Sequence, residues 1–185
     1  MAYRNATYFG FDGLGQSDPS RSDFRYYAIV QKWDTQRNID FKFVNSHEKA
    51  SSVRNTSKRS TLERSIRERM RASKNMVIIL SDETRKQGSM LSYEIEKAVD
   101  TYGLPLIIAH TGFDVILRPE DLAFRWPNVL NHRIQNNTAN AIHIPFKREA
   151  ILDAISQFTV SSKNLFGGLN YYARQTQINW GYFGS

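Results

Sequence analysis

NMVIILSDETRKQGSMLSYEIEKAVD, residues 75–100, is the stretch from which the rest of the fold can be worked out. Its apolar run, residues 76–80, has the length and β-branched content of a strand buried on both faces. A polar loop follows over residues 81–88, and a helix then begins, with Ser89 placed to cap its first turn. A buried strand, a loop and a helix in this order predict one unit of a parallel sheet covered by helices.

One carboxylate of this helix stands among its apolar residues. At about 100° per residue, Glu94 falls inside the apolar arc, whereas Glu96 and Asp100 fall on the opposite, solvent-facing side. Glu94 also lies just beyond the carboxyl end of a central strand, where open α/β sheets hold their ligands. A glutamate at the edge of an apolar stripe can also reach water or pair with an arginine. Periodicity alone therefore leaves a functional and a structural role open.

The same alternation of strand and helix continues along the chain. The Gly-containing segment DGLGQSDPS, after the first strand, predicts a turn. The capping box Ser60-Thr61-Leu62-Glu63 predicts the start of a basic helix. We expect strands at residues 6–11, 41–44, 76–80, 104–109 and 141–145, and helices at residues 24–33, 60–73, 89–102 and 147–158. This pattern predicts an α/β fold in which a five-stranded parallel sheet lies between two layers of helices.

Three segments do not follow the alternation. Residues 48–57 are small and polar, which is typical of a long mobile loop. Residues 111–140 are irregular, with a short helical turn expected near Arg118. The tail is rich in aromatic residues, which we expect to pack on the domain or on a neighbouring subunit. We therefore divide the chain into a domain of residues 1–158 and a C-terminal extension of residues 159–185.

Composition narrows the class of protein. A chain of 185 residues with 41% hydrophobic residues is long enough for one globular domain. It has no cysteine, which excludes a disulfide framework, a thiolate metal site and a thiol nucleophile, and we expect no metal site. No leader sequence or membrane-length apolar run is present, so we expect a cytoplasmic protein that does not bind membranes.

The net charge of +7 comes largely from residues 54–74, where eight Lys or Arg stand against Glu63 and Glu68. Such a cluster favours an anionic partner, but it is also what a solvated helix face looks like. No aromatic residue is interleaved with these basic residues, which weakens the case for single-stranded nucleic acid. Nucleic-acid binding would rest on the basic cluster alone, and we do not expect it.

The sequence also resembles that of a known protein family. The run TLERSIRERMRASKNMVIILSDETRKQGSMLSYEIEKAVDTYGLPLII, residues 61–108, resembles the TIR-like proteins of bacteria, in particular the TIR-domain family that includes the Thoeris antiphage sensor. The segments YFGFDG, DFRYYAIVQKW, DFKFVNSHE and AIHIPFKREAILDAI support the resemblance in the right order. It extends over most of residues 7–158 and implies a flavodoxin-like fold with five parallel strands.

The resemblance implies an activity. Many members of the family cleave NAD between nicotinamide and ribose, and some recyclise ADP-ribose into a signal that activates a partner effector. Their essential residue is the glutamate of a W-x-x-x-E pattern, which here reads Met90-Leu91-Ser92-Tyr93-Glu94, with Met90 in the place of Trp. Glu94 is then the catalytic carboxylate, NAD is the substrate and no cofactor is needed. The resemblance implies that the substrate is lined by Phe11, Asp12, Asn45, Ser46, His47, Ser81 and Met90.

The family also implies assembly, so we expect a homo-oligomer in which the loop of residues 48–57 helps to close the site. Two other readings stay open. The chain could be a non-catalytic TIR scaffold that acts by self-association. A phosphoacceptor receiver domain has the same fold, and for it the sequence offers Asp12, Asp82 and Lys147.

Overall fold

The structure is a computed structural model that describes residues 4–14, 23–35, 43–45, 56–162 and 165–183. Its centre is a sheet in which every pair of neighbouring strands is parallel. The five predicted strands are confirmed, and they lie in the order β2-β1-β3-β4-β5. They are β1 (Ala6–Phe11), β2 (Phe43–Asn45), β3 (Ser73–Leu80), β4 (Leu106–His110) and β5 (Ala141–Pro145).

This strand order is that of the flavodoxin-like fold. The chain runs from β1 outward to β2, then returns past β1 to β3, so the direction of winding reverses beside β1. Ligands of open α/β sheets bind outside the carboxyl ends of the strands at such a reversal. The ends of β1 and β3 are therefore where a site is expected.

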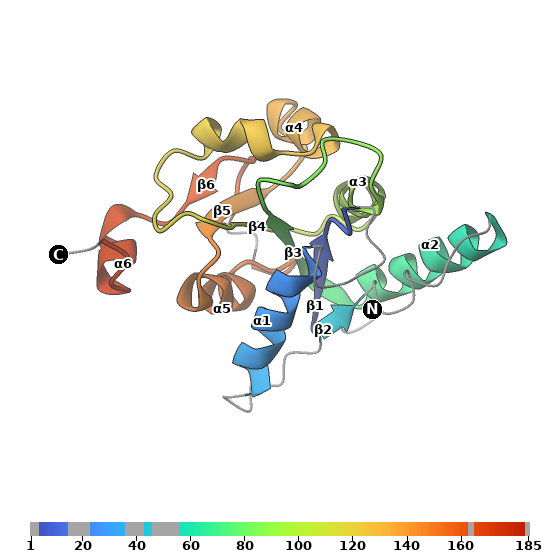
Figure 1. Ribbon diagram of the computed structural model, residues 1–185, viewed down its shortest axis with the longest axis horizontal. Coiled ribbons are helices and arrows are strands. Elements are labelled where there is room, and N and C mark those ends of the chain that lie inside the picture. The colour runs from blue at the N-terminus through green and yellow to red at the C-terminus, as the bar shows by residue number, and fades with distance from the viewer. Residues whose placement is uncertain (1–3, 15–22, 36–42, 46–55, 163–164, 184–185) are drawn as a thin grey trace.

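Helices cover both faces of the sheet and make three layers (Figure 1). One face is covered by α1 (Phe24–Thr35) and α5 (Arg148–Gln157). The other is covered by α2 (Thr56–Arg71), α3 (Met90–Glu96) and α4 (Asn128–Gln135). A π-helical turn, η3 (Lys97–Thr101), continues α3, and Gly103 follows it with φ of 58°, a left-handed conformation that is common just after the end of a helix.

Strand alternation divides the core into two clusters. In β1, Tyr8 packs in the cluster under α2, α3 and α4, whereas Phe9 and Phe11 pack in the cluster under α1 and α5. In β3, Met76, Ile78 and Leu80 belong to the first cluster and Val77 and Ile79 to the second. All the side chains of β3 from residue 75 to residue 80 are fully buried, which confirms a strand covered on both faces.

Two sequence predictions on the α2 to α4 face are wrong. The helix α2 begins at Thr56, so Ser60 lies inside it and the capping box does not form its start. Glu63 instead meets Arg59 at 3.0 Å and Arg67 at 4.0 Å, the i−4 and i+4 neighbours. The region predicted to be irregular contains α4 as well as the expected turn, η4 (Pro119–Arg125). Asn and His are weak helix formers, and this short helix buries only Leu130 and Ile134.

The C-terminal tail packs against the α5 side of the sheet. Its strand β6 (Asn170–Tyr171) pairs with β5 and adds a short sixth strand, and α6 (Arg174–Asn179) follows. Leu165 and Tyr182 join the core cluster of α1 and α5, and the Tyr182 hydroxyl accepts a hydrogen bond of 3.1 Å from the Ala150 N–H. Phe166 remains 84% exposed and Tyr171 46% exposed, so the tail also carries apolar surface.

Gln177 joins the tail to the loop after β4. It lies in α6 and is 1% exposed. Its Oε1 accepts a hydrogen bond from the Ile116 N–H at 3.1 Å, and its Nε2 donates to the carbonyls of Ile116 and Tyr172, each at 2.8 Å. The tail is thus held by directed hydrogen bonds as well as by aromatic packing. Across the described part of the chain, no helix is both long enough and apolar enough to cross a lipid bilayer.

Candidate functional site

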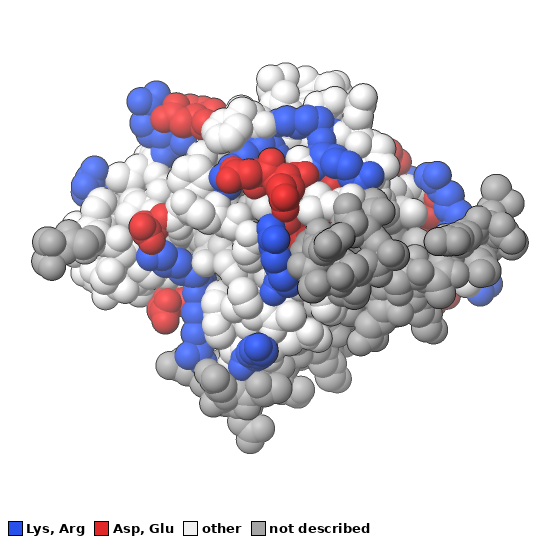
Figure 2. All heavy atoms as spheres, in the orientation of Figure 1, with Lys and Arg blue, Asp and Glu red and all other residues white. Residues whose placement is uncertain are grey.

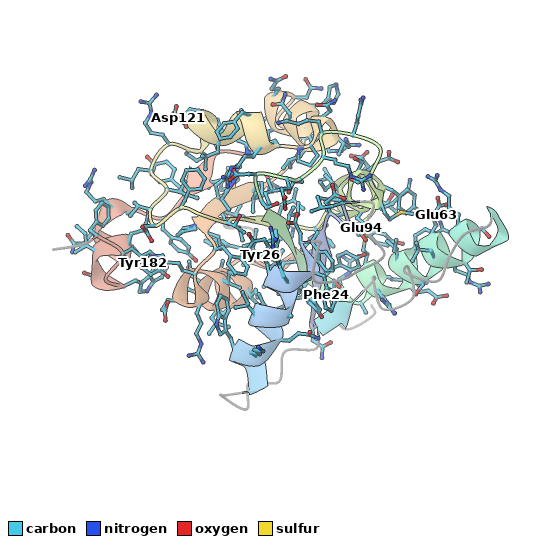
Figure 3. The ribbon with its side chains drawn as sticks, viewed as in Figure 1. Phe24, Tyr26, Glu63, Glu94, Asp121 and Tyr182 are labelled. Atoms are coloured by element: carbon cyan, nitrogen blue, oxygen red, sulfur yellow. The ribbon has the colours of Figure 1, made fainter. Side chains whose placement is uncertain are left out.

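Glu94 lies at α3, next to the sheet (Figure 3). Its side chain is completely buried. The hydroxyl of Tyr8 in β1 donates a hydrogen bond of 2.8 Å to Glu94 Oε1. The position of Glu94 inside the apolar arc of its helix is therefore real, and Leu91 and Ile95 are buried beside it. By contrast, the side chain of Glu96 is 45% exposed and that of Asp100 48% exposed. Burying a carboxylate costs folding free energy, so the burial of Glu94 suggests a role other than stabilising the fold.

Gly10 makes room for this carboxylate. A Cβ atom on Gly10 would lie 3.1 Å from Glu94 Oε2, 3.0 Å from Leu91 Cδ1 and 2.4 Å from Met76 Cε. Gly10 lies within β1, inside the strand predicted over residues 6–11. Its role is the close approach of α3 to the strand, which is one of the few reasons for glycine inside a strand.

Asp12 follows β1 directly and is clamped by the loop after β3. Arg85 donates to it from the backbone N–H at 2.8 Å, from Nε at 3.0 Å and from Nη2 at 2.7 Å. The Leu14 N–H donates at 2.9 Å. Burial raises the pKa of Asp12, but the hydrogen bonds from Arg85 and Leu14 outweigh it and hold the pKa below its usual value. Asp12 is thus a buried, ionised anchor for Arg85.

Ser81 lies in the same loop, at the end of β3, and is 3% exposed. Its N–H donates to Thr84 Oγ1 at 2.9 Å, and Thr84 Oγ1 donates to Asp23 Oδ2 at 3.1 Å. Burial raises the pKa of Asp23 to about 6, against the hydrogen bonds that lower it. The structure therefore brings Asp12 and Ser81 to one sheet edge, where Asp23 and Thr84 hold the turn that carries Ser81.

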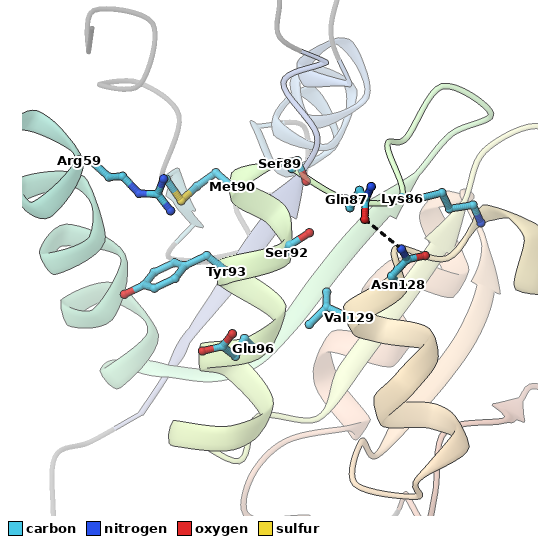
Figure 4. Close-up of a pocket in the computed structure, with 11 residues that line it drawn as sticks. Arg59, Lys86, Gln87, Ser89, Met90, Ser92, Tyr93, Glu96, Asn128 and Val129 are labelled. Atoms are coloured by element: carbon cyan, nitrogen blue, oxygen red, sulfur yellow. Dashed lines mark hydrogen bonds between the residues drawn. The ribbon is translucent and has the colours of Figure 1, made fainter. Parts of the chain in front are cut away.

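Met90, the residue at the family's Trp position, lines a pocket of about 560 Å³ on the outer side of α3. The pocket lies between α2, α3 and α4 (Figure 4). Glu94 is not among its lining residues, because its side chain points to the sheet. The other residues that line it are Arg59, Lys86, Gln87, Gly88, Ser89, Ser92, Tyr93, Glu96, Asn128 and Val129.

Phe11, another predicted site residue, does not lie beside Glu94. Phe11 packs against Phe24 and Tyr27 of α1 on the opposite face of the sheet, with ring centroids 5.9 Å and 5.5 Å away. The backbone of Asn45 ends β2 and is in register with Phe9 of β1. Ser46, His47 and most of the predicted loop of residues 48–57 lie outside the described residues, and Thr56 and Ser57 belong to α2.

Two histidines form a buried pair on the same face of the sheet as α3. His110 ends β4 and is stacked on His143 of β5, with 3.0 Å between Nε2 of His110 and Nδ1 of His143. Nε2 of His143 donates to the Gly168 carbonyl at 2.8 Å, which makes His143 Nδ1 the acceptor and His110 Nε2 the donor. Burial lowers the pKa of His110 well below its usual value and that of His143 to about 4, so both rings are neutral near pH 7.

The three residues needed for a receiver domain are engaged separately. Asp12 binds Arg85, Asp82 is 78% exposed and pairs with Arg125, and Lys147 pairs with Asp114 at 2.8 Å. Within the described residues no group of three or more His, Asp or Glu side chains could hold a metal ion. The structure therefore gives no support to a receiver domain.

The charged side chains do not form a basic field on the face seen in Figure 2, where acidic and basic groups lie next to one another. On α2, Arg59 pairs with Glu63, and Arg67 donates to the Tyr93 hydroxyl at 2.8 Å. Leu62, Ile66 and Met70 face the core, which leaves most of the basic residues of this helix on its solvated face.

Sequence reasoning missed three contributors to this edge of the sheet: Tyr8, Gly10 and Arg85. A glycine inside an apolar strand was a usable signal for close approach. Tyr8 and Arg85 left no such signal, because each acts through a residue far away in the sequence, Glu94 and Asp12 respectively.

A comparison with known families identifies the chain. The family described as Thoeris protein ThsB, TIR-like domain, matches residues 8–114, which is more than half of the sequence. The match includes β1 from Tyr8 onward, β3 and α3, and with them Gly10, Asp12, Arg85 and Glu94. Together with the flavodoxin-like parallel sheet, it shows that the chain belongs to the family of TIR-like domains of the Thoeris protein ThsB.

Proposed function

We propose that this protein is an NAD-consuming enzyme of antiphage defence, in which Glu94 is the catalytic carboxylate. The observation that carries the proposal is the burial of Glu94 at the sheet's winding reversal, where Tyr8 orients it and Gly10 makes room for it. A folding role alone is served by a leucine or an alanine at this position, since a buried carboxylate costs stability.

The chemistry suits a single carboxylate. The bond between C1′ of the ribose and the pyridinium nitrogen breaks, its electron pair goes to the nitrogen, and nicotinamide leaves as a neutral base. The sugar then carries oxocarbenium-like positive charge, as in glycoside hydrolysis. A fixed carboxylate stabilises that charge and can accept hydrogen bonds from the ribose hydroxyls.

Two fates of this cation are open to the protein. Water can add to C1′ with loss of a proton and give ADP-ribose. A nucleophile within the same molecule can add instead, again with loss of a proton, and give a cyclic isomer of ADP-ribose. We propose the second route, with the cyclic product acting as a signal for a separate effector protein.

Glu94 is fully covered in the structure, so the substrate must enter through an opened state. We propose that the assembly of several copies stabilises that state. A cytoplasmic location, where NAD is abundant, completes the proposal.

Glu94→Gln tests the catalytic assignment, because the amide keeps an oxygen that can accept the Tyr8 hydrogen bond and loses only the charge. We expect nicotinamide release from NAD to fall at least ~100-fold. The matched control is Glu96→Gln, two residues away and 45% exposed, which keeps the wild-type rate. Full turnover in Glu94→Gln excludes this residue as the catalytic group. Mass analysis of the products separates linear from cyclic ADP-ribose.

The second candidate is a non-catalytic TIR scaffold. Met90 in the place of Trp and the covered carboxylate favour it. Under this proposal the purified protein releases no nicotinamide at any concentration, including under crowding, yet still self-associates. Release assays run together with sedimentation analysis distinguish the two functions.

A further inference from the structure

Asp12 and Arg85 lie close to the Glu94 site, at the carboxyl end of β1. Tyr8 and Gly10 are alternate positions of β1 and share a face, and Asp12 follows the end of the strand, two residues after Gly10. Glu94 lies against the first two, and Arg85 is bound to the third. Two extended residues span about 7 Å, so Asp12, with the Arg85 guanidinium that it binds, lies near Gly10, against which the Glu94 carboxylate packs.

Arg85 is held more firmly than a surface arginine. Its Nε and Nη2 grip both oxygens of Asp12, and its own backbone N–H donates to the same carboxylate. The Asp12 side chain is completely buried, so it cannot move away with the arginine into solvent. The guanidinium therefore has one orientation before any ligand arrives.

Part of this guanidinium is still available. The Arg85 side chain is 41% exposed, and its Nη1 donates no hydrogen bond to any described residue. Arginine has five N–H donors in a planar fork, of which Asp12 engages only one edge. The other edge suits the oxygens of a phosphate, to which arginine binds in a bidentate manner.

We propose that Arg85 binds the phosphate on the 5′ carbon of the ribose whose C1′ faces Glu94. This inference rests on the proposed function, since it takes the substrate's cleaved bond to lie at Glu94. The 5′ phosphate is separated from C1′ by the length of one ribose, which is comparable with the distance of about 7 Å that the two residues from Gly10 to Asp12 can span. The ligand class is thus a 5′-phosphorylated ribosyl pyridinium, and Asp12 is the positioning residue that aims Arg85.

Nicotinamide mononucleotide and nicotinamide riboside differ only by this phosphate, and they are the probes. We expect wild-type protein to bind the mononucleotide at least about 10-fold more tightly by calorimetry, as for one charged hydrogen bond. Arg85→Gln should abolish this preference and leave riboside binding unchanged. The matched control is Arg25→Gln, which removes an arginine of similar exposure, paired with Glu83 in the same loop.

Arg85→Gln leaves the buried Asp12 carboxylate without its main partner, so the variant could fold poorly. The double variant Asp12→Asn, Arg85→Gln removes that charge as well. It should fold and still show no preference for the mononucleotide.

Kinetics supply the second measurement. With NAD as substrate, Arg85→Gln should raise KM about 10-fold or more with little change in kcat. Equal binding of the two probes by wild type, or a preference that survives in folded Arg85 variants, overturns the inference. An equal loss of riboside and mononucleotide binding also overturns the inference, because Arg85 would then support the structure of the site without binding the phosphate. If the preference depends on Arg85 but no nicotinamide is ever released, the proposed catalytic function fails and this phosphate site stands.

Discussion

Tyr8 in β1 and Glu94 in α3 are joined by a hydrogen bond of 2.8 Å between two fully buried side chains. They are 86 residues apart in the sequence, so the bond forms only when α3 has docked on the sheet. The pair therefore reports both on the integrity of the core and on the orientation of the carboxylate.

Tyr8→Phe removes the donor and keeps the ring. We expect unfolding free energy to fall by about 1–3 kcal/mol, because a buried carboxylate loses a hydrogen bond. Urea denaturation measures the change, and NAD turnover should decrease in the same variant. Tyr171→Phe is the control: this tyrosine is 46% exposed, and its variant should match wild type. Equal stability of both variants contradicts a structural role for the Tyr8 hydroxyl.

Gly10→Ala places a methyl group against Met76, Leu91 and Glu94. Overpacking of this kind costs about 1–3 kcal/mol, and we expect turnover to fall as the carboxylate is displaced. Gly13→Ala is the control, since a Cβ there meets nothing within 4 Å. Thermal unfolding compares the two. A Gly10→Ala protein as stable and active as Gly13→Ala means that α3 can move away from β1 at no cost.

Gln177→Ala tests how firmly the tail is attached. The change removes the bonds to Ile116 and Tyr172 and leaves their buried backbone groups without that partner. We expect a loss of about 2–4 kcal/mol and faster proteolysis of the tail. Gln175→Ala, in the same helix but with an exposed side chain, should have little effect. A tail that resists protease in both variants shows that aromatic packing alone holds it.

The histidine pair predicts a loss of stability in mild acid. The pKa of His143 is about 4 in the folded protein, and that of His110 is also lowered, against 6.5 when unfolded. The unfolded chain therefore takes up protons first, and stability is lost as pH falls from 6.5 toward 4. The slope is about 1.4 kcal/mol per pH unit for each histidine.

Asp23 acts in the opposite direction over part of this range. Its pKa is raised to about 6 from 3.8, so the folded state binds its proton more tightly and gains stability as pH falls. The measurement is therefore made by urea denaturation in an Asp23→Asn background, with and without His110→Phe and His143→Leu. An acid slope that is unchanged by the histidine substitutions contradicts the prediction.

Sequence reasoning was most reliable where local pattern and tertiary packing agree. The first strand has the predicted bounds, and the burial of Glu94 follows from the periodicity of its helix. The helix α4 was missed because its two buried residues, Leu130 and Ile134, make too short a pattern among weak helix formers.

Only part of the candidate site could be predicted, because some of its contacts depend on the path of a loop. Asp12 and Ser81 do lie at one sheet edge, because both follow strands that are neighbours in the sheet. Phe11 lies on the α1 and α5 face of the sheet, because successive residues of a strand point to opposite faces. This alternation could have been read from the sequence. The Arg85 clamp on Asp12 depends on the path of a loop, and no local pattern encodes that path.

The short strand β6 has a consequence for solubility. Without it, β5 would present unpaired amide and carbonyl groups along a strand whose side chains include Ile142 and Ile144. Such an edge is a template on which other chains can add strands and aggregate. A chain cut after residue 158 would lose the pairing of β6 with β5, so we expect it to aggregate more readily than the full chain.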